Sequence, residues 1–199
     1  LPTERIILGI DPGTSILGYG IIKAVGQQLS LITLGVIKLD HLDDHGLKLQ
    51  RIFKKTHALI EQYHPDCVAL EAPFYGKNIQ VMLKLGRAQG VAMAAALNRD
   101  IPIFEYAPRK IKQAVTGNGS AAKEQVAAML KTLLKLKIVS NSTVMSALVV
   151  GLSPLVTTAG PLVIARLRAS RRRFCYMAQD LSMVMLSKSP INAFTTLST

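Results

Sequence analysis

The stretch Ile6-Ile-Leu-Gly-Ile-Asp11-Pro-Gly-Thr-Ser15 decides the fold class, because an apolar run of strand composition ends in an acid directly before a Pro-Gly turn. The arrangement returns at Cys67-Val-Ala-Leu-Glu71-Ala-Pro73. In open α/β sheets, ligands bind outside the carboxyl ends of the strands. Two strand-end carboxylates therefore predict a site for a hard divalent cation, whose preferred ligands are carboxylate and water oxygens.

Each acid taken alone has a simpler explanation, because an acid before a turn is most often a turn former or a helix cap. The second occurrence of the pattern is what favours a functional pair. A bound cation compensates the repulsion that would otherwise raise the pKa of one of the two carboxyls. We therefore interpret the chain as a metal-dependent nuclease that uses Asp11 and Glu71.

Length and charge point to one domain with a polyanionic partner. The chain has 199 residues and a formal net charge of +12, and its basic residues are spread along it. Nucleic acid is the expected partner, and a merely solvated basic surface is the alternative. Two cysteines give no disulfide framework, and the first residues lack the pattern of a secretory signal. We expect a cytoplasmic protein.

The first half of the chain predicts a mixed sheet. Three β-rich runs should form an antiparallel meander, and a helix then leads to a returning strand. These elements are expected at residues 6–10, 19–23, 29–39, 47–63 and 67–70. A connection of helix length makes the returning strand parallel to its neighbour. Glu71 should then lie at the same edge of the sheet as Asp11.

Small residues crowd one side of the next predicted helix, over 79–97, and include Gly86 and Gly90. They let another backbone approach closely. Packing on this chain's own sheet and contact with a homodimer partner both explain the pattern, and periodicity does not separate them.

Further elements follow in the order strand, helix, loop, helix. They are predicted at 101–106, from Pro108, at 117–119, and from 121 to about 137 with Ser120 as the cap. Upstream, the cluster Asp40-His-Leu-Asp43-Asp44-His45 contains potential metal ligands. We interpret it as a polar loop with a helix cap, because it directly precedes a helix and lacks a recognised ligand spacing.

Composition changes abruptly after Lys137. Residues 138–165 carry no charge, and a cluster of arginines follows from Arg166 to Arg173. This resembles a membrane span with a positive flank, but Pro154, Pro161 and eight Ser, Thr or Asn residues between positions 140 and 158 argue against a span. We expect a nuclease domain over 1–137, leave an extension to about 153 open, and expect an aberrant, disordered basic tail over 154–199.

Two runs around the predicted acids resemble the RuvC family of crossover-junction endodeoxyribonucleases, and three later motifs follow in that family's order. The two runs are Leu8-Gly-Ile-Asp11-Pro-Gly-Thr-Ser-Ile-Leu-Gly18-Tyr-Gly20 and Glu71-Ala-Pro-Phe74-Tyr-Gly-Lys77-Asn78. The later motifs are Leu85-Gly-Arg-Ala-Gln-Gly90, Tyr106-Ala-Pro-Arg109-Lys-Ile-Lys112-Gln and Gly117-Asn-Gly-Ser-Ala-Ala-Lys123-Glu-Gln-Val126. The resemblance covers about residues 5 to 137.

The resemblance implies a ribonuclease-H-like α/β fold, with three antiparallel strands, two parallel strands and flanking helices. It also implies a homodimer that resolves four-way (Holliday) junction DNA by paired nicks, uses two Mg²⁺ or Mn²⁺ ions per site, and works with a branch-migration helicase in recombination and repair. It assigns catalysis and metal binding to Asp11 and Glu71. It assigns DNA binding to Phe74, Lys77, Asn78, Arg109, Lys112 and Lys123. Phe74 would stack at the junction centre, and burial in the core is the alternative for it. Lys112 and Lys123 would contact DNA near the cut phosphate, and an exposed position on a helix is the alternative for each of them.

One departure from the family pattern concerns two further acids, which the family carries one helical turn apart before an Ala-Leu pair. Thr143 and Ser146 stand in those places here. Hydroxyls bind Mg²⁺ weakly, so we expect poor metal binding and impaired catalysis. Because the family pattern fails in this region, we also expect the run from Ala147 to Leu152 to rebuild the last helix only partly. We hypothesise that the reading frame was disturbed near Lys137, which resequencing of the coding DNA would test.

Two other classes of function stay open on the sequence. A non-catalytic junction-binding protein would keep the basic surface and Phe74 but lack chemistry. A phosphotransferase of the actin or sugar-kinase type could also use an Asp-x-Gly-Thr turn, but the length of the chain disfavours the two domains that this architecture needs.

Overall fold

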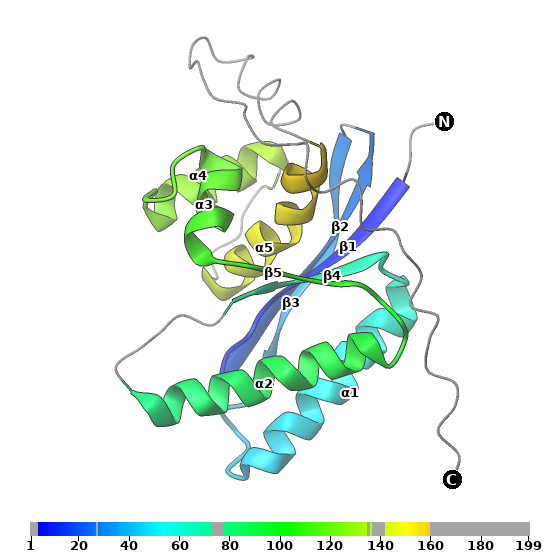
Figure 1. The fold of residues 1–199 in the computed structure, drawn as a ribbon, viewed down its shortest axis with the longest axis vertical. Coiled ribbons are helices and arrows are strands. Elements are labelled where there is room, and N and C mark those ends of the chain that lie inside the picture. Colours follow the sequence, from blue (N-terminus) through cyan, green and yellow to red (C-terminus); the bar gives the residue numbers. More distant parts are fainter. Residues whose placement is uncertain (1–3, 27, 73–77, 135, 137–141, 160–199) are drawn as a thin grey trace, which may run out of the picture.

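The computed structural model describes residues 4–26, 28–72, 78–134, 136 and 142–159. A single five-stranded sheet, in the order β3-β2-β1-β4-β5, lies between two layers of helices (Figure 1). One layer holds α1 and α2, and the other holds α3, α4 and α5. The strands are β1 (Glu4–Asp11), β2 (Ile16–Val25), β3 (Gln28–Lys38), β4 (Cys67–Glu71) and β5 (Ile103–Tyr106).

The sheet has the predicted mixed topology. β1, β2 and β3 form the antiparallel meander, and β4 lies parallel to β1 with Ile7 opposite Cys67 and Ile10 opposite Leu70. β5 adds a second parallel pair next to β4. The predictions of a ribonuclease-H-like sheet and of a parallel returning strand are confirmed. The fifth strand begins at Ile103, two residues later than expected.

Helices α1 (His45–Tyr63) and α2 (Ile79–Leu97) pack on one face of the sheet. The side chain of Asp44 accepts a hydrogen bond of 2.8 Å from the backbone N of Leu47 and so caps α1. This confirms the cap interpretation of the Asp40–His45 segment. The capped helix turns its buried side chains, which include Ile52 and Ile60, toward the core.

The small residues of α2 divide into two sets. Ala88, Ala92 and Ala96 are almost completely buried in the same core as Leu8 and Ile10 of β1. Gly86 and Gly90, by contrast, face open space, because a Cβ at either position would meet no atom within 4 Å. The alanines therefore serve packing within this chain, while the glycines leave a flat surface on the outside of α2.

The other layer consists of α3 (Pro108–Thr116), α4 (Lys123–Leu133) and α5 (Ser142–Ala159). Pro108 occupies the first turn of α3, as predicted. The prediction that Ser120 caps a helix beginning at residue 121 is wrong. α4 begins at Lys123 with Ala122 as its N-cap residue, and the backbone N of Ser120 instead donates to the side chain of Asn118 within the preceding turn.

α5 is a complete helix of 18 residues, so the expectation of a partly rebuilt last helix is wrong. Its length shows that helical structure continues past residue 153, although Pro154 lacks the N–H that would bond one turn back. Ala147, Leu148 and Val150 are fully buried against the sheet. In the part of the chain described by the structure, none of the helices combines the length and apolarity that a membrane crossing requires.

Glycines let α5 lie directly on the sheet. A Cβ on Gly9 of β1 would come within 2.2 Å of the carbonyl oxygen of Ala147, and a Cβ on Gly18 of β2 within 2.5 Å of that of Thr143. Real Cβ atoms do not approach backbone so closely, so only glycine fits at these positions. The backbone of α5 is thereby fixed next to the ends of β1 and β2.

Candidate active site

Asp11 and Glu71 lie side by side at one edge of the sheet. Each is the last residue of its strand, and Ile10 of β1 lies opposite Leu70 of the parallel strand β4. The two side chains are in hydrogen-bonding contact. The local sequence explains this placement, because each apolar strand is followed at once by a proline-containing turn that ends the ladder.

The environment of the two acids favours their neutral forms. Burial, followed by the charge of Glu71, raises the pKa of Asp11 from 3.8 to about 7. Burial also raises the pKa of Glu71 above its usual 4.5, while the nearby ammonium of Lys112 opposes this shift. Below about pH 7, Asp11 is mostly protonated and its O–H donates a hydrogen bond to Glu71, since two adjacent carboxylates do not readily ionise together.

α5 brings both hydroxyl residues to this edge. Ser146 donates a side-chain hydrogen bond to Asp11 and thereby lowers its pKa. Thr143 lies one turn earlier, with its backbone against Gly18 of β2. The two positions at which the family resemblance expects acids therefore lie next to Asp11. A carboxylate at position 146 in place of the serine hydroxyl would face the existing pair.

Gln89 of α2 supports the same edge from the opposite face of the sheet, and sequence reasoning missed it. Its side chain is only 3% exposed. The amide Nε2 donates to the carboxylate of Glu105 and, at 3.5 Å, to the backbone carbonyl of Glu71. A buried amide that joins the ends of β4 and β5 holds Glu71 in position. Its only signal in the sequence is a long polar residue within a run of small ones.

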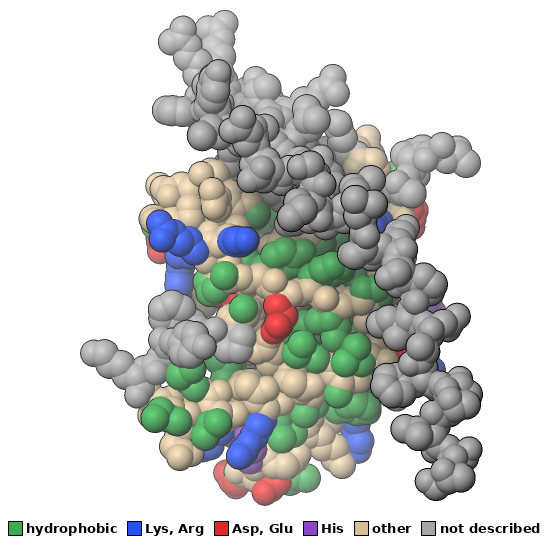
Figure 2. All heavy atoms as spheres, viewed as in Figure 1, with side chains coloured by type: hydrophobic (Ala, Val, Ile, Leu, Met, Phe, Trp, Pro, Cys, Tyr) green, Lys and Arg blue, Asp and Glu red, His purple; other side chains and the backbone are tan. Residues whose placement is uncertain are grey.

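Basic residues of α3 and α4 face the two acids. The ammonium groups of Lys112 and Lys123 both lower the pKa of Glu71, and Lys123 also lowers that of Asp11. Figure 2 shows Lys and Arg side chains gathered over α3 and α4, beside a small acidic group. Arg109 lies in the same layer and packs on Gly119, where a Cβ would come within 2.7 Å of its Cγ.

The predicted DNA-binding residues before α2 are only partly described. Phe74 and Lys77 lie outside the described residues. The side-chain oxygen of Asn78 accepts a hydrogen bond of 3.2 Å from the backbone N of Val81 and caps α2. Asn78 therefore has a structural role, whatever else it contacts.

The donor set at this edge fits one hard divalent cation. Two carboxylates in contact and the hydroxyl of Ser146 supply oxygen ligands, and a cation would relieve the repulsion that raises the pKa of Asp11. Within the described residues, no group of three or more His, Cys, Asp and Glu side chains comes together. Protein ligands for a second ion are correspondingly scarce.

A ribonuclease-H-like sheet with paired strand-end carboxylates defines a class of nucleases that hydrolyse phosphodiester bonds. A family model described as "Crossover junction endodeoxyribonuclease RuvC" matches residues 7–153. The chain belongs to this family of metal-dependent endonucleases. The match extends into α5 and thus includes the positions of Thr143 and Ser146.

Curated relatives carry the same description. The crossover junction endodeoxyribonuclease RuvC of Cytophaga hutchinsonii is 63% identical over 131 residues, which make up 66% of each chain. That of Porphyromonas gingivalis is 60% identical over 135 residues, or 68% of this chain and 71% of its own. These matches take in roughly two thirds of the relatives' length.

Solved structures agree on the architecture. The Thermus thermophilus RuvC, in complex with a Holliday junction substrate, superposes with a TM-score of 0.71 at 30% identity and covers 82% of this chain and 96% of its own. The yeast mitochondrial Holliday junction resolvase Ydc2 has a TM-score of 0.54 at 14% identity, a likeness that concerns the fold alone. Family and fold together remove the phosphotransferase alternative.

Proposed function

We propose that this chain is a structure-specific DNA endonuclease that resolves four-way junctions by paired symmetrical nicks during homologous recombination and repair. The observation that carries the proposal is the contact between Asp11 and Glu71 at the common end of two parallel strands, faced by Lys112 and Lys123. The two carboxylates would bind a metal cation, and the two lysines beside them would bind a phosphate. Such a site is suited to phosphodiester hydrolysis.

The proposed cofactor is Mg²⁺ or Mn²⁺, with Asp11 and Glu71 as the protein ligands of one ion. The second ion that the family resemblance implies would take most of its ligands from the DNA phosphate and water. Bound metal would supply Lewis acidity and an activated water for in-line displacement. The protein's own contribution is to place the carboxylates, through the strand ends and the Gln89 amide, and to lower their charge repulsion through the two lysines. Ser146 offers a weaker oxygen in place of a third carboxylate.

The proposed DNA contacts extend outward from this edge. Lys112 and Lys123 would contact the phosphates near the cut, and Arg109 would extend the basic surface along α3. Phe74, Lys77 and Asn78 would act at the junction centre, where an aromatic ring can stack on any base.

The proposed assembly is a homodimer through α2. Ile79 and Leu83 are 70% and 50% exposed. They lie on the side of α2 that also carries Gly86 and Gly90, which leave the helix open to close approach. An exposed apolar helix face with small residues suits a two-fold contact between identical chains. We further propose that the protein acts on chromosomal DNA in the cytoplasm and that a branch-migration helicase is its partner.

The sequence predicts a nuclease domain over 1–137 and leaves an extension to about 153 open; we propose that the domain includes all of α5, because this helix packs in its core. Residues 154–159 of the expected tail are helical, and the rest of that tail lies outside the described residues. The hypothesis of a disturbed reading frame near Lys137 concerns this same region. Resequencing tests it, and an intact frame in the source genome would contradict it.

A non-catalytic junction binder is the second candidate. It is favoured by the neutral Thr143 and Ser146 at the place where a metal site needs acids. The two candidates differ in one experiment, since replacing both residues with Asp should restore cutting only in a nuclease whose fold and DNA binding are intact.

The test uses an end-labelled four-way junction with and without Mg²⁺ or Mn²⁺, and resolves both bound complexes and nicked strands. The nuclease proposal predicts paired nicks that require metal, disappear in Asp11→Asn, and are absent on a linear duplex of the same sequence. Binding without nicks in either metal, even at high concentrations, would instead establish the junction binder.

A further inference from the structure

A second basic site lies on the face of the sheet that α1 covers. A cavity of about 500 Å³ opens between α1 and the outer strands β2 and β3. Its basic lining residues are Lys38 at the end of β3, His41 in the loop that follows, and Arg51 and Lys55 on α1. The remaining lining residues are Tyr19, Val36, Ile37, Ala58, Leu59 and Gln62. None of these residues belongs to the active site described above.

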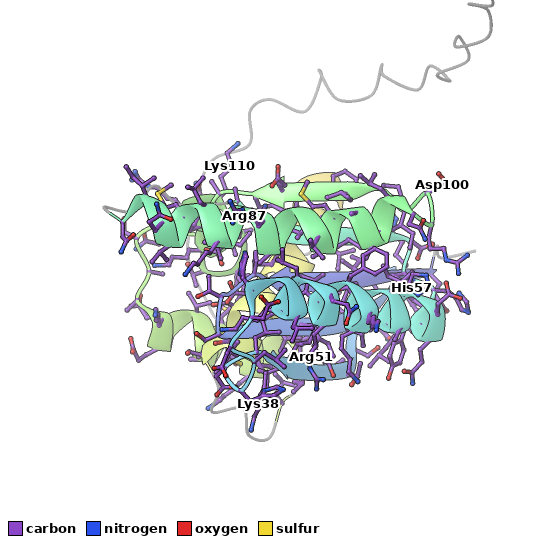
Figure 3. All side chains as sticks on the ribbon, turned by 90° about the horizontal axis from the view of Figure 1, so that it is seen from below. Lys38, Arg51, His57, Arg87, Asp100 and Lys110 are labelled. Carbon is purple, nitrogen blue, oxygen red and sulfur yellow. The ribbon has the colours of Figure 1, made fainter. Side chains whose placement is uncertain are left out.

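Most of the basic groups of this cavity have no acidic partner in the part of the chain that the structure describes. Among the described residues, Lys38, Arg51 and Lys55 form no ion pair, and His41 lies 3.6 Å from the exposed Asp40. Arg51 and Lys55 stand one turn apart on α1, a spacing at which like charges destabilise a helix. Figure 3 shows Lys38 and Arg51 together on the side of α1 that faces away from α2. This arrangement is favourable when an anion occupies the cavity.

The wall of the cavity includes an aromatic side chain laid over a glycine. Tyr19 pairs with Gly35 on the neighbouring strand, and a Cβ on Gly35 would come within 2.6 Å of the Tyr19 hydroxyl. Gly35 therefore makes the room that the phenol occupies. The hydroxyl of Tyr19 and the amide of Gln62 provide neutral hydrogen-bonding groups beside the cations, a combination typical of contacts to phosphate and sugar oxygens.

The cavity lies at the same end of the sheet as the catalytic acids. Tyr19 pairs with Ile10, the residue before Asp11, and Lys38 pairs with Ile16 at the start of β2. Adjacent strands are about 4.8 Å apart, so the cavity begins within a few strand spacings of Asp11. A polyanion bound at Asp11 and Glu71 would extend past this end of the sheet and reach α1.

The geometry points to a phosphate-binding site in this cavity that holds the sugar-phosphate backbone of one junction arm, away from the cut, through Lys38, Arg51 and Lys55. The proposal extends the proposed function, but it concerns binding alone. Its test therefore uses no cutting step and is performed without divalent metal, on wild-type protein and on variants with the natural active site.

The experiment measures affinity for a labelled four-way junction across a series of salt concentrations. Arg51→Gln combined with Lys55→Gln should raise the Kd about 10-fold and reduce the slope of log K against log salt by about 2, because each lost phosphate contact removes close to one unit. Lys54→Gln combined with Lys131→Gln removes the same charge from exposed positions outside the cavity. This control should change the slope by less than half as much.

Two further measurements identify the anion. The effect of the double variant should disappear when the junction arms are trimmed so that they no longer reach α1. Inorganic triphosphate distinguishes a site for free phosphates: if it raises the Tm of the wild type and not that of the variant, while junction affinity is equal in both, the DNA assignment is overturned. Equal slopes for the cavity variant and its control would show an ordinary solvated basic surface and would also overturn it.

Folding and function are controlled separately. Unchanged Tm values for both double variants would show that the fold is intact, and Lys38→Gln alone provides a milder variant with an expected slope change of about 1. If the protein proves unable to nick DNA, the proposed function fails, but a selective loss of slope in the cavity variant would still support this binding site.

Discussion

Replacing Asp11 with Asn should stabilise the metal-free protein, and should do so more at pH 8 than at pH 5. The pKa of Asp11 rises from 3.8 to about 7 on folding. When folding raises the pKa of an acid, the protein loses stability as the pH rises from the pKa of that acid in the unfolded state to its pKa in the folded state. With 1.36 kcal/mol for each pKa unit, this shift destabilises the folded protein by about 4 kcal/mol at pH 8, where Asp11 is ionised, and by about 1.6 kcal/mol at pH 5, where it stays protonated.

Asn is neutral at both pH values and nearly isosteric with Asp. The gain in unfolding free energy from Asp11→Asn should therefore be about 2.5 kcal/mol larger at pH 8 than at pH 5. Urea unfolding in the presence of EDTA measures both values. Asp43→Asn, at an exposed loop position, makes the same charge change and should show a pH difference close to zero.

Divalent metal should narrow the difference in stability between the two proteins. Mg²⁺ binds the folded wild type through Asp11 and Glu71, so it should raise the unfolding free energy of the wild type at pH 8 and leave that of Asp11→Asn nearly unchanged. An equal gain from Asp11→Asn at the two pH values would refute the reasoning, because it would mean that Asp11 is not desolvated beside a second carboxyl. So would a Mg²⁺ effect of the same size in both proteins.

Three further changes test the site and its scaffold. Thr143→Asp combined with Ser146→Asp should raise the junction-nicking rate at least 10-fold and lower the metal concentration for half-maximal rate, because carboxylates replace weak hydroxyl ligands; an unchanged rate would argue for the junction binder. Gln89→Leu should slow nicking about 10-fold with junction affinity retained, because Glu71 loses a positioning hydrogen bond; a proportional loss of affinity would indicate general damage. Gly9→Ala should lower the unfolding free energy by about 3 kcal/mol, because its Cβ meets the backbone of α5, and a change below 1 kcal/mol measured in urea would show that the helix can move away.

Matched controls separate these effects from unspecific ones. Gly86→Ala adds the same methyl group in open space on α2 and should stabilise the helix by up to about 1 kcal/mol. Gln80→Leu changes the same side chain at an exposed position of the same helix and should leave the nicking rate within about twofold of wild type.

The sequence predicts the sheet and the carboxylate pair well, because both depend on local patterns. Apolar runs ending at Asp11 and Glu71 specify strand ends, and the helix between them requires a parallel connection. The contact between the two acids then follows from the register. Asp44 as a helix cap is equally local, since the side chain bonds a backbone N only three residues away.

Features that depend on contacts across the fold could not be predicted in this way. The hydrogen bond from the side chain of Gln89 on α2 to the backbone carbonyl of Glu71 at the end of β4 joins residues that are 18 positions apart in the sequence. The start of α4 was misplaced because Asn118 takes the backbone N–H of Ser120 into a turn. The completeness of α5 was underestimated because its stability comes from burial on the sheet, which outweighs the unfavourable Pro154.

Because α5 packs closely on glycines of the sheet, the position of a ligand on this helix depends little on which side chain provides it. The closest contacts of the helix with Gly9 and Gly18 are made mainly by its backbone atoms, at Ala147, Gly151 and Thr143. Hydroxyl, amide, imidazole or carboxylate groups can therefore be presented to Asp11 from one unchanged scaffold. Substitutions at positions 143 and 146 should therefore change the metal preference of the site without changing the fold of the domain.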